Sequence, residues 1–239
     1  MSVLPVPEEK AIFVERMFAR IAPGYDRVNR AMTFGLDQNW RRLVVEAVAP
    51  PIDGHALDIG TGTGDFLPML AAWMPRGTAV GVDFCLPMMV AGQPRREAEP
   101  SATRVSFTCG DALKLPFPDQ TFDAITTGFV MRNVVDIGQA FREMYRVTRP
   151  GGAMACLEVA RPRNPLLRVG HRLYFEQVVP WIGALLGGDR SAYTYLPQSA
   201  RAFPPPDQLA ELMRGAGWQY VHYRLLGFGA VAIHIGAKI

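Results

Sequence analysis

Short apolar runs alternate with stretches of helical periodicity along most of this chain. Runs of strand length lie at residues 56–59, 79–82, 105–108 and 153–159, with another after Asp123. Residues 137–147 instead carry apolar side chains at helical spacing, and Pro150-Gly151-Gly152 then favours the end of that helix. This alternation predicts an α/β fold with a doubly wound, mostly parallel sheet and right-handed crossovers.

The C-terminal pattern adds two strands of a different kind. A helix is expected over Pro206–Gly215, followed by strands at Tyr220–Leu226 and Ala230–Ala237 that Gly227 and Gly229 join. So short a connection makes an antiparallel pair, and the sheet is therefore expected to have seven strands and to end in a hairpin. This order of elements resembles that of the class I methyltransferases, whose fold is Rossmann-like.

Two segments fall outside the expected sheet, although 1–239 is expected to be a single domain. In 1–50, an apolar helical stripe and a second helix are marked by Ile12, Phe13, Met17, Phe18, the run Tyr25–Asn29 and Trp40. Residues 164–204 form an insert rich in large apolar side chains. We expect both segments to cap the carboxyl edge of the sheet, where a substrate enters. An insert this apolar favours an apolar substrate; the alternative is that its side chains only dock it on the sheet.

A glycine-rich loop carries the clearest chemical signal. The sequence ALDIGTGTGD (Ala56–Asp65) ends one apolar run, and the next run ends in Asp83. Glycines let a ligand approach the backbone, and a carboxylate at the following strand end accepts both hydroxyls of a ribose. Dinucleotide sites carry G-x-G-x-x-G and a pyrophosphate, which Asp58 would repel, so a cationic nucleoside such as S-adenosylmethionine fits better. The alternative is a plain turn, with Asp65 as a helix cap and Asp83 in solvent.

Composition narrows the classes of partner. A net charge of +3, from 25 basic and 22 acidic residues without a basic groove pattern, favours no nucleic-acid partner. Cys85, Cys109 and Cys156 lack C-x-x-C spacing, which favours reduced cysteines in a cytoplasmic protein without a bound metal. No signal peptide or apolar run of about 18 residues is found, so no spanning helix is expected. The stretch Gln93–Arg104 is expected to be a surface connection.

Longer motifs resemble the methyltransferases of menaquinone and ubiquinone biosynthesis through nearly the whole chain. The most particular are YDRVNRAMTFGLDQNWRR (Tyr25–Arg42), MRNVVD (Met131–Asp136) and the run Ser191–Leu212. The resemblance implies methyl transfer from S-adenosylmethionine to a ring carbon of an isoprenylated quinol, with 2-demethylmenaquinol as the expected acceptor. It implies catalytic roles for Tyr25, Arg132 and Asn133. It also implies cofactor contacts, with Asp111 at the adenine, by Asp58, Gly60, Gly62, Thr63, Gly64, Asp83, Phe84, Asp111, Ala112 and Gly128.

Two positions depart from the family pattern. Members commonly read FGLRN or FGIRN where this chain has FVMRN, so Val130 replaces a glycine. Gly128 stands where many members have a serine. These departures bear on the acceptor pocket rather than on the donor, so they leave the identity of the quinone open.

The expected reaction needs a group that accepts a proton. Loss of the hydroxyl proton, with a pKa of about 10 by analogy with tyrosine, makes the neighbouring ring carbon nucleophilic. Arg132 is expected to stabilise the phenolate, while Asn133 and Tyr25 orient the ring oxygens. Arginine is a poor base, which leaves a water or His171 to take the proton. The alternative for Arg132 is an ion pair with Asp136; for His171 we favour a polar position on an amphipathic insert helix.

Other functions are compatible with the same residues. One is methylation of another apolar phenol, a lipid or a ubiquinone precursor; another is a catalytically silent donor-binding or scaffold protein. Because a polyisoprenoid quinol partitions into the bilayer, weak peripheral association with the inner face of the membrane is also expected. Leu166–Leu186 would face it, with Arg168, His171 and Arg172 toward lipid phosphates. The alternative is that this stretch packs inward as a lid.

Overall fold

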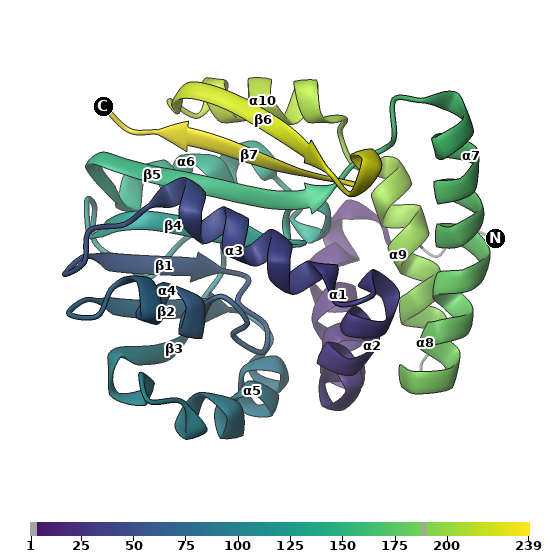
Figure 1. Ribbon diagram of the computed structural model, residues 1–239, viewed down its shortest axis with the longest axis horizontal. Coiled ribbons are helices and arrows are strands. Elements are labelled where there is room, and N and C mark those ends of the chain that lie inside the picture. Colours follow the sequence, from purple (N-terminus) through teal and green to yellow (C-terminus); the bar gives the residue numbers. More distant parts are fainter. Residues whose placement is uncertain (1–3, 188–189) are drawn as a thin grey trace.

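A seven-stranded sheet, in the order β3-β2-β1-β4-β5-β7-β6, forms the centre of the computed structural model (Figure 1). The structure describes residues 4–187 and 190–239; residues 1–3 and the 188–189 step of the apolar insert lie outside it. Neighbours from β3 to β5 pair in parallel, whereas β7 is antiparallel to β5 and β6, which confirms the expected sheet and hairpin. The strands are β1 (His55–Ile59), β2 (Thr78–Asp83), β3 (Val105–Cys109), β4 (Phe122–Gly128), β5 (Thr148–Val159), β6 (Gln219–Leu226) and β7 (Val231–Ala237).

Helices cover both faces of the sheet, as the doubly wound pattern predicts. One buried cluster joins Val44 and Leu70 to the first face, and a second joins Phe141 and Met213 to the other. The apolar spacing seen in the sequence thus points into the core. The covering helices are α3 (Leu36–Val48) and α4 (Leu67–Trp73) on the first face, α6 (Ile137–Val147) and α10 (Pro206–Gly215) on the second, and α5 (Leu86–Ala98) beside β3.

The stretch Gln93–Arg104 lies at the surface and leads into β3, as expected, but much of it is helical. Helix α5 continues through Pro94 to Ala98, and a 3₁₀ turn, η2 (Ala102–Arg104), follows. Arg96 Nη1 donates to the carbonyl oxygens of Ala102 (3.3 Å) and Val105 (3.0 Å), so the guanidinium holds the end of the helix against the start of β3. An arginine that the sequence suggests is solvated therefore stabilises the contact between α5 and β3.

Strand β5 begins at Thr148, well before Ala153, where the sequence places its start. The amide of Gly151 donates to the Lys238 carbonyl (2.7 Å), and the Lys238 amide donates to Gly152 (2.9 Å). The two glycines therefore lie within β5 and join the sheet beside Lys238, whereas helix α6 has already ended at Val147. Their flexibility suits this irregular start, where Gly151 has a φ of +84°.

The N-terminal helices and the insert lie together beyond the carboxyl ends of the parallel strands, on the right of Figure 1. Their bounds are α1 (Pro7–Ile21), η1 (Ala22–Gly24), α2 (Tyr25–Thr33), α7 (Pro165–Leu173), a π-helical turn (Tyr174–Val178), α8 (Val179–Gly187) and α9 (Arg190–Ala202). Helix α2 packs on α8 and α1 packs on α9, so the two segments contact each other. The run Tyr25–Asn29 lies in α2 and Trp40 in the following helix, α3, whereas Ile12 is exposed.

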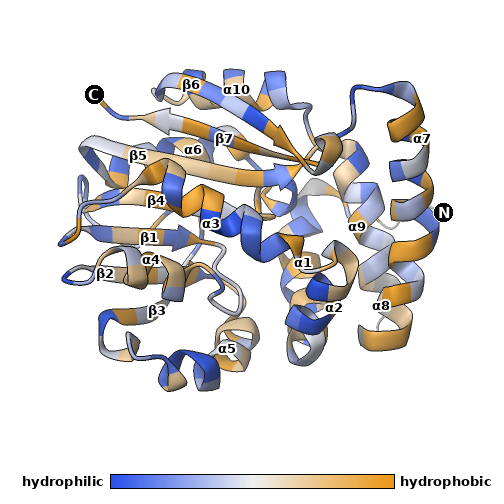
Figure 2. Cartoon of the chain, in the orientation of Figure 1, coloured by the Kyte–Doolittle hydropathy of each residue, from blue (hydrophilic) through white to orange (hydrophobic). Residues whose placement is uncertain are grey.

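Hydrophobic residues also recur on the outside of the cap. Figure 2 shows them along α7 and α8, where Leu166, Trp181 and Leu185 are each more than two-thirds exposed, at 83%, 76% and 75%. None of the helices in the described residues has the length and hydropathy needed to span a bilayer. The insert therefore has two apolar sides. The inner side packs against the N-terminal helices, and the outer side is exposed.

Candidate functional site

The loop after β1 takes a conformation that favours glycine. Gly60, Gly62 and Gly64 have φ values of +63°, +54° and +83°, in the left-handed region. A Cβ on Gly64 would lie 2.8 Å from the Phe107 ring, and one on Gly60 would lie 2.4 Å from a methyl group of Val130. The glycines thus serve both the turn and the close approach of neighbouring side chains.

Asp83, at the end of β2, is fixed by the same loop. Its two carboxylate oxygens accept from the amides of Gly62 and Cys85, each at 2.8 Å. Asp83 is only 8% exposed, so the alternative of a solvated carboxylate is wrong. Burial raises the pKa of Asp83, while these amides oppose the rise. Each oxygen keeps a second lone pair and so retains capacity for a ligand hydroxyl.

Asp58 lies beneath the loop. Its side chain is buried and accepts a hydrogen bond from the Thr126 hydroxyl at 2.9 Å. Burial raises the pKa of Asp58 to about 7, against hydrogen bonds and the charge of Arg41. The group is therefore partly protonated near neutral pH.

The other residues that are expected to contact S-adenosylmethionine lie around the same edge of the sheet and differ in their burial. Phe84 and Asp111 are exposed, Ala112 is half-buried, and one Asp111 oxygen accepts from the Leu113 amide at 2.9 Å. Gly128 packs against Phe66, because a Cβ there would lie 2.8 Å from its ring. Glycine at that position therefore serves close packing within the fold.

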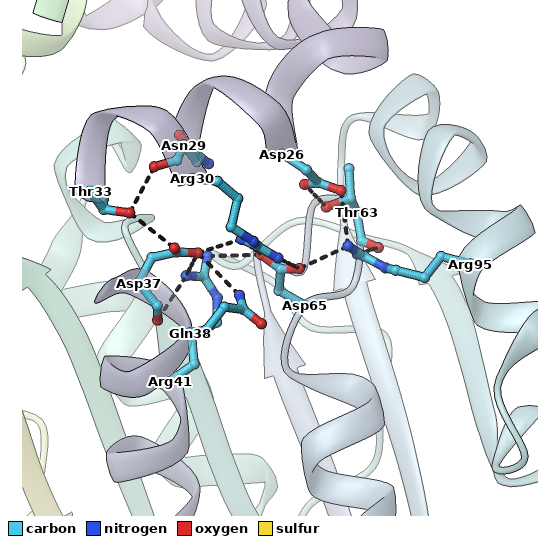
Figure 3. Close-up of polar contacts among 10 residues, drawn as sticks. All are labelled: Asp26, Asn29, Arg30, Thr33, Asp37, Gln38, Arg41, Thr63, Asp65 and Arg95. Carbon is cyan, nitrogen blue, oxygen red and sulfur yellow. Dashed lines mark hydrogen bonds and ion pairs between the residues drawn. The ribbon is translucent and has the colours of Figure 1, made fainter. Parts of the chain in front are cut away.

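A network of carboxylates and arginines ties the cap to the glycine loop (Figure 3). Thr63 donates its hydroxyl to Asp26 of α2 at 2.7 Å, and Arg95 of α5 bonds Asp26 at 2.9 Å. Asp65 pairs with Arg95 at 3.0 Å, with Arg30 at 3.2 Å and with Arg41 of α3 at 3.5 Å. Burial by itself would raise the pKa of Asp65, yet these arginines hold that pKa below its usual value.

This network corrects one alternative and adds residues that sequence reasoning missed. Asp65 does not cap α4, whose N-cap is Phe66 without a side-chain hydrogen bond. A second buried carboxylate, Asp37, pairs with both Arg30 and Arg41. Asp37 and Arg41 are four residues apart on α3, a spacing that could have marked this pair in the sequence. The arginine partners of Asp65 are far from it along the chain and leave no local signal.

The three expected catalytic residues meet in one cavity of about 320 Å³, here called the apolar cavity. Tyr25 comes from α2, whereas Arg132 and Asn133 come from a 3₁₀ turn, η3 (Met131–Asn133), after β4. Its volume is at the lower end of the range for small-molecule sites. The walls include Met17, Phe18, Trp40, Phe129, Phe175 and Val179.

Arg132 is held by a buried carboxylate that sequence reasoning missed. Its Nη1 lies 3.3 Å from an oxygen of Glu158 and donates to the Phe129 carbonyl at 2.5 Å. Both side chains are nearly inaccessible, at 7% and 1% exposure. The alternative partner, Asp136, instead caps α6 by accepting from the Gln139 amide. Burial raises the pKa of Glu158, and the charge of Arg132 opposes this.

Tyr25 and Asn133 present neutral polar groups to the cavity. Asn133 Oδ1 accepts from the Tyr195 hydroxyl at 3.2 Å, and its amide lies 3.4 Å from the Phe129 carbonyl. Burial raises the pKa of Tyr25, although Arg132 and Arg41 oppose it, so its phenol stays protonated. His171 lies on the insert helix α7, as expected, and also lines this cavity.

The glycine loop and Asp83 form an edge of the sheet, here called the donor edge. It is adjacent to the apolar cavity, but different residues line the two. The cavity lining contains Phe129 and Arg132 but none of the three loop glycines, nor Asp83. Val130 stands between the two, since its side chain fills the space next to Gly60. In the described residues, no group of three or more histidine, cysteine or acidic side chains has the arrangement of a metal site.

Known proteins resemble this chain over almost its full length. The ubiE/COQ5 methyltransferase family matches residues 5–238. A demethylmenaquinone methyltransferase from Roseiflexus castenholzii is 63% identical over 237 residues, covering 99% of this chain and 98% of that protein. A protein with the same description from Thermus thermophilus is 44% identical over 222 residues, covering 93% of this chain and 100% of its own.

Solved structures resemble the fold at lower identity. A SAM-dependent methyltransferase from Thermotoga maritima has a TM-score of 0.65 at 23% identity, covering 94% of this chain and 99% of its own. Another from Aquifex aeolicus has a TM-score of 0.61 at 15% identity, covering 90% and 98%. These structures establish the fold, and the sequence relatives add the family. The chain belongs to the ubiE/COQ5 methyltransferase family.

Proposed function

We propose that this methyltransferase moves a methyl group from S-adenosylmethionine to a ring carbon of a prenylated quinol, with demethylmenaquinol as its acceptor. The observation that carries the proposal is Arg132, a guanidinium held by Glu158 in the wall of an apolar cavity beside the glycine loop. The names of the relatives from Roseiflexus castenholzii and Thermus thermophilus support the same acceptor. The cap segments 1–50 and 164–204 form one catalytic unit with the sheet in this proposal.

The residues at the donor edge fit S-adenosylmethionine, which supplies an electrophilic methyl group when bound. Asp83 is oriented by two backbone amides and keeps lone pairs for the ribose hydroxyls. Asp111 and Phe84 are exposed where the adenine would lie, and Gly60, Gly62 and Gly64 leave the backbone open to the rest of the donor. The carboxylates favour a cation over a pyrophosphate.

The residues of the apolar cavity fit a quinol head group. Its walls exclude water and bury the ring, while Arg132 attracts the oxygen that gains negative charge as its proton leaves. Tyr25 stays protonated and so can donate a hydrogen bond to a ring oxygen. Asn133 is held by Tyr195, which fixes its orientation. Alignment of the ring carbon with the methyl group supplies most of the acceleration, about 7–11 kcal/mol for well-oriented reactants.

A panel of acceptors tests this proposal. Purified protein is incubated with deuteromethyl-labelled S-adenosylmethionine and demethylmenaquinol, a demethylated ubiquinone precursor or a simple phenol, and labelled products are measured by mass spectrometry. Label on a ring carbon of demethylmenaquinol, at the highest kcat/KM of the three, is expected. Higher kcat/KM on a simple phenol would replace the quinol with another aromatic substrate. Donor binding without turnover on any acceptor would indicate a silent protein.

We further propose that the cap associates weakly with anionic membrane surfaces. Leu166, Trp181 and Leu185 are exposed on its outer side, and Arg168 and Arg172 provide exposed positive charge on the same insert. A surface of this kind lies in the lipid interface with its basic groups near phosphates. Phe34 and Phe228, exposed at 78% and 87%, also line the apolar cavity and so continue this surface to its opening.

Co-sedimentation with vesicles tests the membrane proposal. Binding to vesicles with anionic lipid is expected at low salt and should weaken as salt rises, because charges near the surface are screened. A double substitution, Trp181→Ser with Leu185→Ser, should reduce it, whereas Ile52→Ser, an exposed apolar residue outside the cap, should not. Absence of binding at low salt, with equal turnover on vesicle-borne and detergent-borne quinol, would leave the insert as a lid alone.

A further inference from the structure

His171 is a half-buried histidine whose Nε2 atom is unused, and it lines the same cavity as the expected catalytic residues. It lies on α7 and lines the apolar cavity together with Tyr25 and Arg132. Its Nε2 is buried, and no described residue forms a hydrogen bond with that atom. A buried polar atom without a partner is costly, so such an atom is usually satisfied by a bound molecule. The quinol head group is the molecule that this cavity is proposed to hold.

The surroundings of His171 fix its ring in place. The imidazole stacks on Phe175, with ring centroids 4.8 Å apart. Phe175 belongs to the π-helical turn Tyr174–Val178, a form that recurs at functional sites. The Tyr174 hydroxyl donates to the Met32 carbonyl at 2.7 Å and so ties this turn to α2. The bond between the π-helical turn and α2 therefore helps to set the position of His171, at the end of α7, relative to Tyr25.

The other polar groups of the cavity are poor proton acceptors. Arg132 is permanently charged and has no free lone pair. Tyr25 has a raised pKa and keeps its proton. Asp37 is engaged by Arg30, Arg41 and the Thr33 hydroxyl. Burial lowers the pKa of His171 from its ordinary value of 6.5, so its imidazole is neutral at neutral pH.

We propose that Nε2 of His171 accepts the proton of the quinol hydroxyl during methyl transfer. The inference rests on the proposed function. The O–H electron pair stays on the oxygen, and the ring carbon forms a bond to the methyl group as the carbon–sulfur bond breaks and leaves its electrons on sulfur. The ring C–H proton then passes to water, its electron pair restores the aromatic ring, and the imidazolium returns its proton to the oxygen. One proton is released overall.

The charged groups around His171 come from several elements. Its own helix carries Arg168 and Arg172, both exposed, and the cavity adds two arginines and one carboxylate. The titratable and charged residues that share the cavity are Tyr25 of α2, Asp37 and Arg41 of α3, Arg132 of η3, Tyr174 of the π-helical turn, and Tyr193 and Tyr195 of α9. Burial lowers the pKa of His171, which favours its neutral form among these groups.

The test compares His171→Gln with the wild type and with His222→Gln, the same substitution at an exposed histidine of β6 outside the cavity. At pH 7 on demethylmenaquinol, His171→Gln should lower kcat about 100-fold or more, the usual effect of general-base loss, with KM within about threefold. His222→Gln should leave kcat unchanged. The wild-type fall of kcat/KM toward low pH, with a pKa below 6.5, should vanish in His171→Gln. Added imidazole should restore part of the activity of His171→Ala.

Two readouts separate this role from a structural one. Affinity for S-adenosylmethionine should be unchanged in His171→Gln, and an NMR titration of the wild type should place the pKa of His171 below 6.5. A kcat within threefold of wild type, or an acidic limb that persists in His171→Gln, would overturn the inference while the proposed function stands. Wild-type protein that methylates no quinol would instead refute the proposed function, and the inference with it.

Discussion

Asp83 is the residue on which the proposed donor binding depends most. Two amides orient its carboxylate, and its remaining lone pairs serve the ribose. We expect Asp83→Ala to raise the Kd for S-adenosylmethionine at least about tenfold, because hydrogen bonds to a charged acceptor contribute ~1.5–3 kcal/mol each. Calorimetric titration measures this, with the exposed Asp53→Ala as a control. Wild-type affinity in a folded Asp83→Ala protein would refute the ribose contact.

Asp58 predicts a pH dependence of stability. Its pKa rises from 3.8 to about 7 on folding, so the folded state binds the proton more tightly. The stabilisation is full below pH 3.8 and is lost as pH rises through 7, up to about 4 kcal/mol over this window. Urea unfolding at several pH values should therefore show Asp58→Asn gaining stability relative to wild type as pH rises. A pH-independent difference would mean that the carboxyl titrates normally.

At the scale of elements, the loop after β1 and the turn after β4 pack directly on each other. A methyl group at Gly60 would overlap Val130, and Gly60→Ala should cost about 1–3 kcal/mol of unfolding free energy from overpacking, in addition to strain at positive φ. Val130→Gly should recover the overpacking part only. Gly62→Ala is the matched control, because it has the same strain but meets only the flexible end of Met88 at 3.2 Å.

Chemical denaturation of the three variants decides the point. Gly60→Ala is expected to be the least stable, with Gly60→Ala/Val130→Gly close to Gly62→Ala. A double variant no more stable than Gly60→Ala would show that the backbone, rather than contact with Val130, sets the cost. The Kd for S-adenosylmethionine can be measured for the same variants. It tells how far the side chain of Val130 shapes the boundary between the donor edge and the apolar cavity.

Elements were predictable where a local pattern encodes them. Strand positions and α6 follow from hydrophobic period, and the glycine loop with Asp83 follows from spacing within a single β-α-β unit. Glu158 was not predictable as the partner of Arg132, because the pairing depends on how β4 and β5 align. The helix through Pro94 was missed for a related reason: packing of α5 against β3 overrides the low helix propensity of proline.

At the scale of the whole molecule, one carboxylate anchors the cap to the sheet. Asp65 pairs with three arginines, among them the buried Arg41. Breaking a buried pair leaves unpaired charge, so Asp65→Asn should lower the unfolding free energy by about 3–5 kcal/mol. Asp53 and its partner Arg76 are both exposed, and their charged atoms are 3.9 Å apart. Asp53→Asn should therefore change the unfolding free energy little. Thermal unfolding measures both, and equal melting temperatures would show that the network adds no stability.

The bond between Tyr174 and the Met32 carbonyl joins two chain segments 142 residues apart into one wall of the cavity. A wall joined in this way opens as a unit, and collective motions of this size take microseconds to milliseconds or longer. We therefore expect Tyr174→Phe to speed release of the methylated, more apolar product from the cavity, measured as the product's dissociation rate by stopped flow. The rate of methyl transfer in a single turnover should stay unchanged, and an unchanged dissociation rate would show that this bond does not hold the wall closed.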